Sequence, residues 1–108
     1  MRGAVDMLIL ARRAKNGDDD ALRRMVDLDV ALTDANAAIF DAANGFHGCV
    51  PGIHEVLRRQ GLLEGIWCLD ENEGLGPGQL GEIDRIWAAY PHLRDDDFVA
   101  EHLDRWLA

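Results

Sequence analysis

Between residues 21 and 42, apolar side chains recur at alternating steps of four and three residues. That spacing places them on one side of an α-helix and predicts a long helix over residues 19–44. Because three of the seven positions are small alanines, we favour a helix packed in a bundle over the alternative, a coiled coil. The seven positions of this apolar seam are Ala21, Met25, Leu28, Leu32, Ala35, Ile39 and Ala42.

Glycine, proline and acidic residues mark the ends of four further helices. Asn16-Gly17 ends the first one, since glycine readily adopts the left-handed conformation of a helix terminus. Pro51 suits the first turn of a helix, where its missing N–H costs nothing. The predicted helices cover residues 4–15, 19–44, 51–61, 77–90 and 95–107, and residues 66–78 are expected to be irregular and extended. The sequence therefore predicts an all-α fold, a small bundle of about five helices in one domain, residues 1–108.

The length and charge of the chain exclude several classes of protein. With 108 residues it is too short for a (β/α)₈ barrel, which needs about 250. The 11 basic and 20 acidic residues give a net charge of −9, so nucleic acid is not an expected partner. No apolar run approaches the roughly 18 residues of a membrane span, and two cysteines do not make a disulfide framework. We therefore expect a cytoplasmic protein with free thiols and no membrane partner.

Residues 45–63 bring together His47, Cys49 and His54, side-chain types that bind metals or support nucleophilic catalysis. Structural zinc usually takes four Cys or His ligands in two closely spaced pairs, and only His47 and Cys49 form such a pair. The same two residues could form a thiol–imidazole dyad near a helix start, but no third residue is evident to orient the imidazole. We expect a surface loop with a small buried Cys49, no cofactor and no metal, with His47 and Cys49 as weak candidates.

The three tryptophans are candidates for an interface with another protein surface. Trp67 lies in the irregular segment, where no helical period places it in a core, so we expect it at an interface. Trp87 and Trp106 lie in predicted helices and are further interface candidates. The Gly-rich stretch 74–82 matches neither a dinucleotide fingerprint nor a phosphate-binding loop, and we interpret it as a turn before a helix.

The order of these segments resembles the region beyond the barrel in the dihydrodipicolinate synthase / N-acetylneuraminate lyase family. In that family a Gly-Asp turn precedes a long helix with an aromatic–acid–Asn ending, and "ARRAKNGDDDALRRMVDLDVALTDANAAIFDAAN" is similar, with Phe40, Asp41 and Asn44 at its end. A Pro-started helix ending in Leu-Gly-Leu follows, and here "PGIHEVLRRQGLL" has Pro51 and Gly61. The stretch "IWCLDENEGLGPGQ" resembles the family's closing extended run and helix start.

The resemblance covers nearly all of the chain but only the C-terminal third of a family member, and it rests on packing and turn residues. The loop at 45–50 is longer than usual, Gly76 stands where serine is common, and the helix at 95–107 is additional. Family members are carbon–carbon lyases that act on pyruvate-type keto acids through a Schiff-base lysine on a barrel strand. No position of this chain matches that lysine, since Lys15 belongs to an Arg-rich helix end.

The resemblance therefore implies a truncated or divergent, aldolase-type family member that retains only the C-terminal helical part. We expect such a chain to be non-catalytic alone and to act in packing or subunit association. Its expected partner is a second copy of itself or another protein. The alternative is a stand-alone small helical module for protein interaction.

Overall fold

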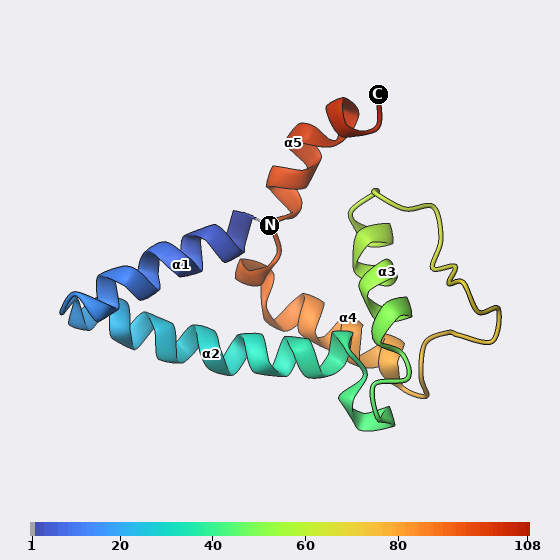
Figure 1. The fold of residues 1–108 in the computed structure, drawn as a ribbon, viewed down its shortest axis with the longest axis horizontal. Coiled ribbons are helices and arrows are strands. Elements are labelled where there is room, and N and C mark those ends of the chain that lie inside the picture. The colour runs from blue at the N-terminus through green and yellow to red at the C-terminus, as the bar shows by residue number, and fades with distance from the viewer. Residues whose placement is uncertain (1) are drawn as a thin grey trace.

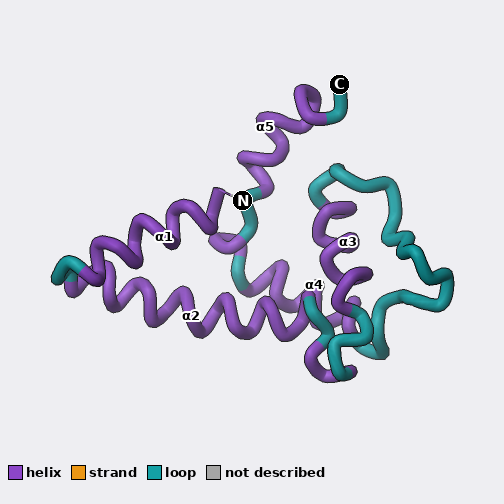
Figure 2. The backbone as a smooth tube through the Cα atoms, in the orientation of Figure 1, coloured by secondary structure: helices purple, strands orange, loops and turns teal. Residues whose placement is uncertain are grey.

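Five α-helices and two short 3₁₀ turns make up the regular structure of residues 2–108, the part of the chain that the computed structural model describes. No strand occurs within those residues, so the all-α prediction is confirmed. Figures 1 and 2 show the helices and the long irregular loop between α3 and α4, which contains the predicted segment 66–78. The elements are α1 (Arg2–Lys15), α2 (Asp19–Ile39), η1 (Ala42–Asn44), α3 (Cys49–Arg59), α4 (Gln79–Ala89), η2 (Pro91–Leu93) and α5 (Asp96–Trp106).

The first two helices form an antiparallel hairpin, which lies at the left of Figure 1. Gly17 has φ of +94°, the left-handed conformation that ends α1. Asp18 caps α2 by accepting a hydrogen bond of 3.0 Å from the Ala21 N–H, and it also pairs with Arg13 at 2.7 Å. The hydrogen bond from the Ala21 N–H has the larger effect, and both contacts lower the pKa of Asp18. The turn between the two helices is thus closed by an acidic cap at the first residue of the run Asp18-Asp19-Asp20.

The predicted end of the second helix at residue 44 is wrong, because α2 stops at Ile39. Asp41 adopts a left-handed conformation with φ of 57°, which no α-helix can continue through. Its side chain binds local backbone and side-chain groups instead, which is how aspartate competes with helix formation. The predicted start of the third helix also shifts, since α3 begins at Cys49 and Pro51 occupies its third position.

The buried core lies mainly where α2 crosses α4. Ala35 and Ala38 of α2 pack with Ile86 of α4, and Ile83 beside it is fully buried. The alanines allow the two helix backbones to approach closely, and the partly buried residues around them complete the contact. Ala31 and Ala38 are buried although they lie outside the predicted seam, so the buried face of α2 is rotated from the one that the sequence predicts. The hydrophobic residues of the described part that are buried are Leu10, Ala21, Ala31, Ala35, Ala38, Ile83, Ile86 and Val99.

The molecule is open rather than spherical. Its extents are 49 × 37 × 23 Å and its radius of gyration is 15.7 Å, compared with about 13 Å for a compact domain of this length. In Figure 1, α5 projects away from the other helices, and α1 reaches past the end of α4. None of the helices within residues 2–108 is both long enough and apolar enough to cross a membrane. The open arrangement leaves helix faces without a covering layer.

Candidate functional site

A buried polar junction joins the end of α2, the start of α3 and the start of α4. Gln79 is only 2% exposed, and its amide group Nε2 donates hydrogen bonds to the carbonyl oxygens of Ile39, at 3.1 Å, and Gly48, at 2.9 Å. Its Oε1 atom accepts a hydrogen bond of 2.8 Å from the Gly76 N–H. One side chain therefore satisfies backbone groups from three separate segments.

Asp41 forms the second half of this junction. Its Oδ2 atom accepts a hydrogen bond of 3.0 Å from the Gly48 N–H, and its Oδ1 atom accepts one of 2.6 Å from Asn44 Nδ2. Asn44 also donates to the carbonyl oxygen of Pro77, at 3.1 Å. A Cβ atom on Gly76 would lie 2.2 Å from Asp41 Oδ2, so the glycine at this position lets the chain pass over the carboxylate. The site is closely packed, and its hydrogen-bonding groups serve the fold.

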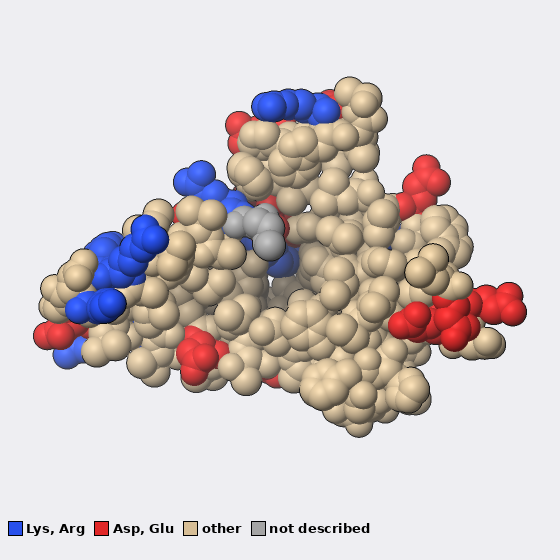
Figure 3. All heavy atoms as spheres, in the orientation of Figure 1, with Lys and Arg blue, Asp and Glu red and all other residues tan. Residues whose placement is uncertain are grey.

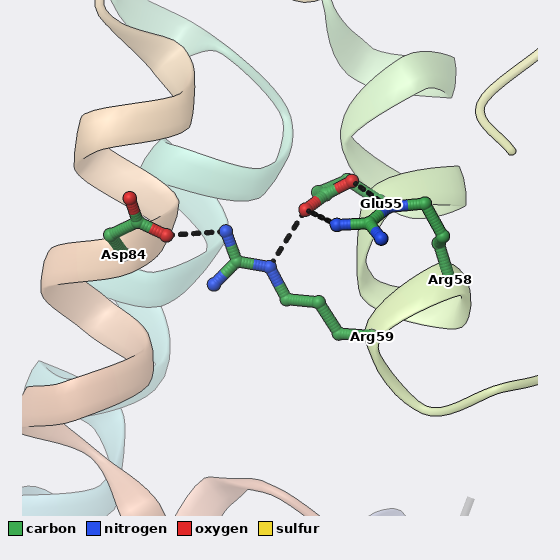
Figure 4. Close-up of polar contacts among 4 residues, drawn as sticks. All are labelled: Glu55, Arg58, Arg59 and Asp84. Carbon is green, nitrogen blue, oxygen red and sulfur yellow. Dashed lines mark hydrogen bonds and ion pairs between the residues drawn. The ribbon is translucent and has the colours of Figure 1, made fainter.

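A network of charged side chains ties α3 to α4, as Figure 4 shows. Glu55 is buried and accepts two hydrogen bonds from Arg58, at 2.8 and 2.9 Å, and one from Arg59, at 2.8 Å. Arg59 also pairs with Asp84 of α4. The guanidinium groups of Arg59 and Arg94 lie 5.2 and 5.3 Å from the centre of the Trp87 ring. Trp87 is therefore half-buried beneath two cations, and this contact favours a structural role.

The arginines determine the acid strength of Glu55. Hydrogen bonds from Arg58, and then from Arg59, lower its pKa to about 2 against the opposing effect of burial. Between that value and its ordinary pKa of 4.5, the unfolded chain binds a proton that the folded chain does not. The stabilisation is therefore complete above pH 4.5 and is lost as the pH falls through the folded pKa.

We expect Glu55→Gln to remove this part of the acid dependence. Wild-type protein should lose up to about 3 kcal/mol of unfolding free energy through Glu55 between pH 5 and pH 2, and the variant should lack that loss. Urea denaturation across this range measures it. The exposed Glu101 supplies a matched control, and the acid profile of Glu101→Gln should follow that of the wild type. Parallel profiles for Glu55→Gln and the wild type would contradict the assignment.

A second ion-pair network connects α2 to α4. Arg85 forms a two-point contact with the carboxylate of Asp34, both hydrogen bonds being 2.8 Å, and Tyr90 donates its hydroxyl proton to the same carboxylate at 2.6 Å. Arg85 also binds Glu82. The hydrogen bond from Arg85, and after it the one from Tyr90, holds the pKa of Asp34 far below its usual range. The charges in this network already have partners, so it contributes to the fold of the helical unit.

The predicted metal or thiol candidates do not come together as one site. His47 is exposed, and Cys49 is half-buried at the first position of α3, less buried than expected. The contact that the sequence reasoning missed joins His54 Nδ1 to Cys68 Sγ, at 3.9 Å. Burial, and then nearby carboxylates, raise the pKa of the Cys68 thiol, which is the opposite of activation. Residues 2–108 contain no group of three or more His, Cys, Asp or Glu side chains that could hold a metal ion.

The predicted interface tryptophans have different surroundings. Trp67 is 75% exposed in the loop before α4. Trp106 is 46% exposed at the end of α5, where it stacks on His102 with ring centres 5.4 Å apart. Trp87 is half-buried between the two guanidinium groups described above. Their role at an interface stays a prediction.

An apolar groove of about 800 Å³ is bounded by α1, α2, the end of α3, η2 and α5. Leucines of several elements line it, together with further apolar residues of α1. The groove does not gather several buried polar groups around one point, so its chemistry suits packing better than catalysis. Residues that line it include Met7, Leu10, Leu28, Leu32, Leu93 and Val99.

The apolar surface extends beyond the groove along the α1–α2 hairpin. Six large apolar side chains there are more than half exposed. These residues are Val5, Leu8, Ile9, Leu22, Val26 and Val30. The groove and this hairpin surface together form the candidate functional site.

Comparison with protein families, curated proteins and solved structures finds no match to this chain. The geometry of the groove and hairpin is therefore the main evidence on what the protein does.

Proposed function

We propose that this chain is a non-catalytic helical packing module that acts by association through its apolar groove. The proposal extends the resemblance to the C-terminal helical part of dihydrodipicolinate synthase-type lyases, in which such helices pack on a barrel and contribute to subunit contacts. The observation that carries it is the groove of about 800 Å³ with the exposed apolar hairpin beside it. Covering apolar surface of this kind with another chain removes it from water, which lowers the free energy of the system.

The environment of the only lysine supports a packing role over Schiff-base chemistry. A nucleophilic lysine needs a desolvated amine whose pKa is lowered by burial or by neighbouring cations. Lys15 is exposed at the last position of α1. It is therefore not desolvated.

We expect the purified chain to associate with itself, because the groove is open in the single chain. Light scattering across a range of concentrations should give a mass above the 12.0 kDa of one chain. Ile9→Asp should return the mass to that of a monomer, since Ile9 lines the groove, is 53% exposed and is not needed for the core.

Leu80→Asp is the matched control for this experiment. Leu80 is 48% exposed on the first turn of α4, away from the groove residues, and an acidic residue there suits the helix dipole. Its mass should equal that of the wild type. A wild-type chain that stays monomeric at high concentration would count against self-association.

The second candidate function is a stand-alone interaction module, and the polar junction together with the two ion-pair networks favours it. These contacts tie α2, α3 and α4 into one unit without help from another chain. This candidate requires a monomer with one cooperative unfolding transition that does not depend on protein concentration. The same light-scattering measurement therefore distinguishes the two functions.

A further inference from the structure

The loop between α3 and α4 presents an apolar projection surrounded by acidic residues. Trp67 is 75% exposed and Leu69 is fully exposed. A local turn gives this segment a defined shape, because the Asp70 side chain accepts a hydrogen bond of 2.9 Å from the Asn72 N–H. Residues 61–78 contain four acidic side chains and no basic one. This loop is the yellow segment at the right of Figure 1, and Figure 3 shows acidic atoms, in red, on the same side of the molecule.

The groove has the complementary character. Its lining is mainly apolar and includes two arginines, Arg13, which already pairs with Asp18 at 2.7 Å, and Arg24. Of the two acids in the lining, Asp6 pairs with Arg2 at 3.5 Å and Asp95 accepts a hydrogen bond of 3.0 Å from Gln60.

The basic residues of the chain also concentrate on the α1–α2 hairpin, which bounds the groove. Residues 1–24 carry six basic and four acidic side chains, although the whole chain has a net charge of −9. Figure 3 shows several basic side chains over the hairpin at the left, together with a few acidic ones, and acidic side chains without basic ones over the loop at the right. An acidic partner segment would therefore find its most favourable docking site at the hairpin end of the groove.

We propose that the loop 66–73 of a second copy of this chain inserts Trp67 and Leu69 into the groove, with its acidic residues facing Arg24. The loop lies beyond α3, on the side away from α1, so the occupant comes from another molecule. A two-fold pair allows both copies to make the same contact at once. The inference rests on the proposed function, since it names the partner that covers the groove.

The aromatic side chain is the first part of the contact to test. Trp67→Ala should raise the dissociation constant of the pair roughly 30-fold or more, because an aromatic residue seated in an apolar pocket is the usual hot spot of an interface. Leu80→Ala, at an exposed apolar residue outside the groove, should leave the constant unchanged. Sedimentation equilibrium measures the constant, and far-UV circular dichroism checks that each variant keeps its helices.

Charge reversal tests the orientation of the loop in the groove. Arg24→Glu should weaken the pair about tenfold by placing an acid against the acidic loop. Adding Glu71→Arg to the same chain should recover most of that loss, because the two charges are then exchanged across the contact. Recovery by the second substitution is an outcome that general unfolding of the Arg24→Glu variant could not produce.

The outcomes separate this inference from the proposed function. If Ile9→Asp abolishes association while Trp67→Ala and both charge variants leave it unchanged, the loop is not the occupant and the groove is covered in another way. If the wild-type chain is monomeric throughout, the pair does not form and the inference fails together with self-association. Two results together support both the proposed function and this inference. Trp67→Ala weakens association, and Glu71→Arg restores the association that Arg24→Glu weakens.

Discussion

Replacing Gln79 with glutamate is expected to lower the unfolding free energy at pH 7 by about 3 to 5 kcal/mol, the usual cost of an uncompensated buried charge. The two side chains have nearly the same shape, so packing is preserved. Gln79 Nε2 donates to the carbonyl oxygens of Ile39 and Gly48, and a carboxylate has no proton to donate. An ionised glutamate would place a negative oxygen against two carbonyl oxygens at a position that is 2% exposed.

The penalty should depend on pH in a defined direction. Burial and the facing carbonyl oxygens favour the protonated acid, so the pKa of glutamate at position 79 is raised in the folded state. The folded variant then binds a proton more readily than the unfolded chain, and its loss of stability grows as the pH rises and shrinks in acid. Protonation also restores one O–H donor to the junction.

Urea denaturation of the variant and the wild type at pH 7 and pH 4.5 measures this difference. Gln79→Met is the matched control, because it removes the same hydrogen bonds without adding a charge. We expect the control to cost about 1 to 3 kcal/mol at both pH values. Equal penalties for the two variants, unchanged between the two pH values, would show that a charge at position 79 carries no penalty and that the junction is open to water.

The helices could be predicted from the sequence because apolar spacing and helix-ending residues act locally. Gly17, Pro51 and Gly61 lie at or near the helix ends that they predict. The end of α2 could not be predicted in this way, because the apolar seam continues through Ala42 while the chain turns at Asp41. One feature of the sequence could have indicated this helix end, namely Asp41 followed three residues later by Asn44. In the structure the Asn44 side chain donates a hydrogen bond to the Asp41 side chain.

The buried polar residues were missed for a different reason. The apolar residues Ile53, Val56 and Leu57 of α3 follow helical spacing, yet Ile53 is exposed and Gly52 and Glu55 are buried. A helix face made of glycine, proline and a charged residue has no apolar signature. The contact of Glu55 with Arg59 spans one helical turn and is therefore local, whereas the contact of Gln79 with Gly48 spans 31 residues and is visible only in the tertiary arrangement.

The glycines at this junction carry the second large expected effect, which concerns Gly52→Ala. A Cβ atom on Gly52 would lie 1.8 Å from the carbonyl oxygen of Ile39 and 2.6 Å from Gln79 Nε2. The carbonyl belongs to the backbone at the end of α2, so the clash can be relieved only by moving α3 away from α2. We expect a loss of about 3 kcal/mol or more, at the upper end of the cost of overpacking.

Gly81→Ala provides the same chemical change with the opposite expected sign. Gly81 is also helical, but it lies in α4 with no atom within 4 Å of an added Cβ. Alanine there should stabilise the protein by about 0.5 to 1 kcal/mol, because it restricts the unfolded chain and favours the helix. Thermal unfolding resolves the pair, since 1 kcal/mol shifts the midpoint of a domain of this size by roughly 4 to 8 °C. If both variants unfold at the wild-type temperature, α2 and α3 do not pack as closely in solution as the contact between Gly52 and Ile39 requires.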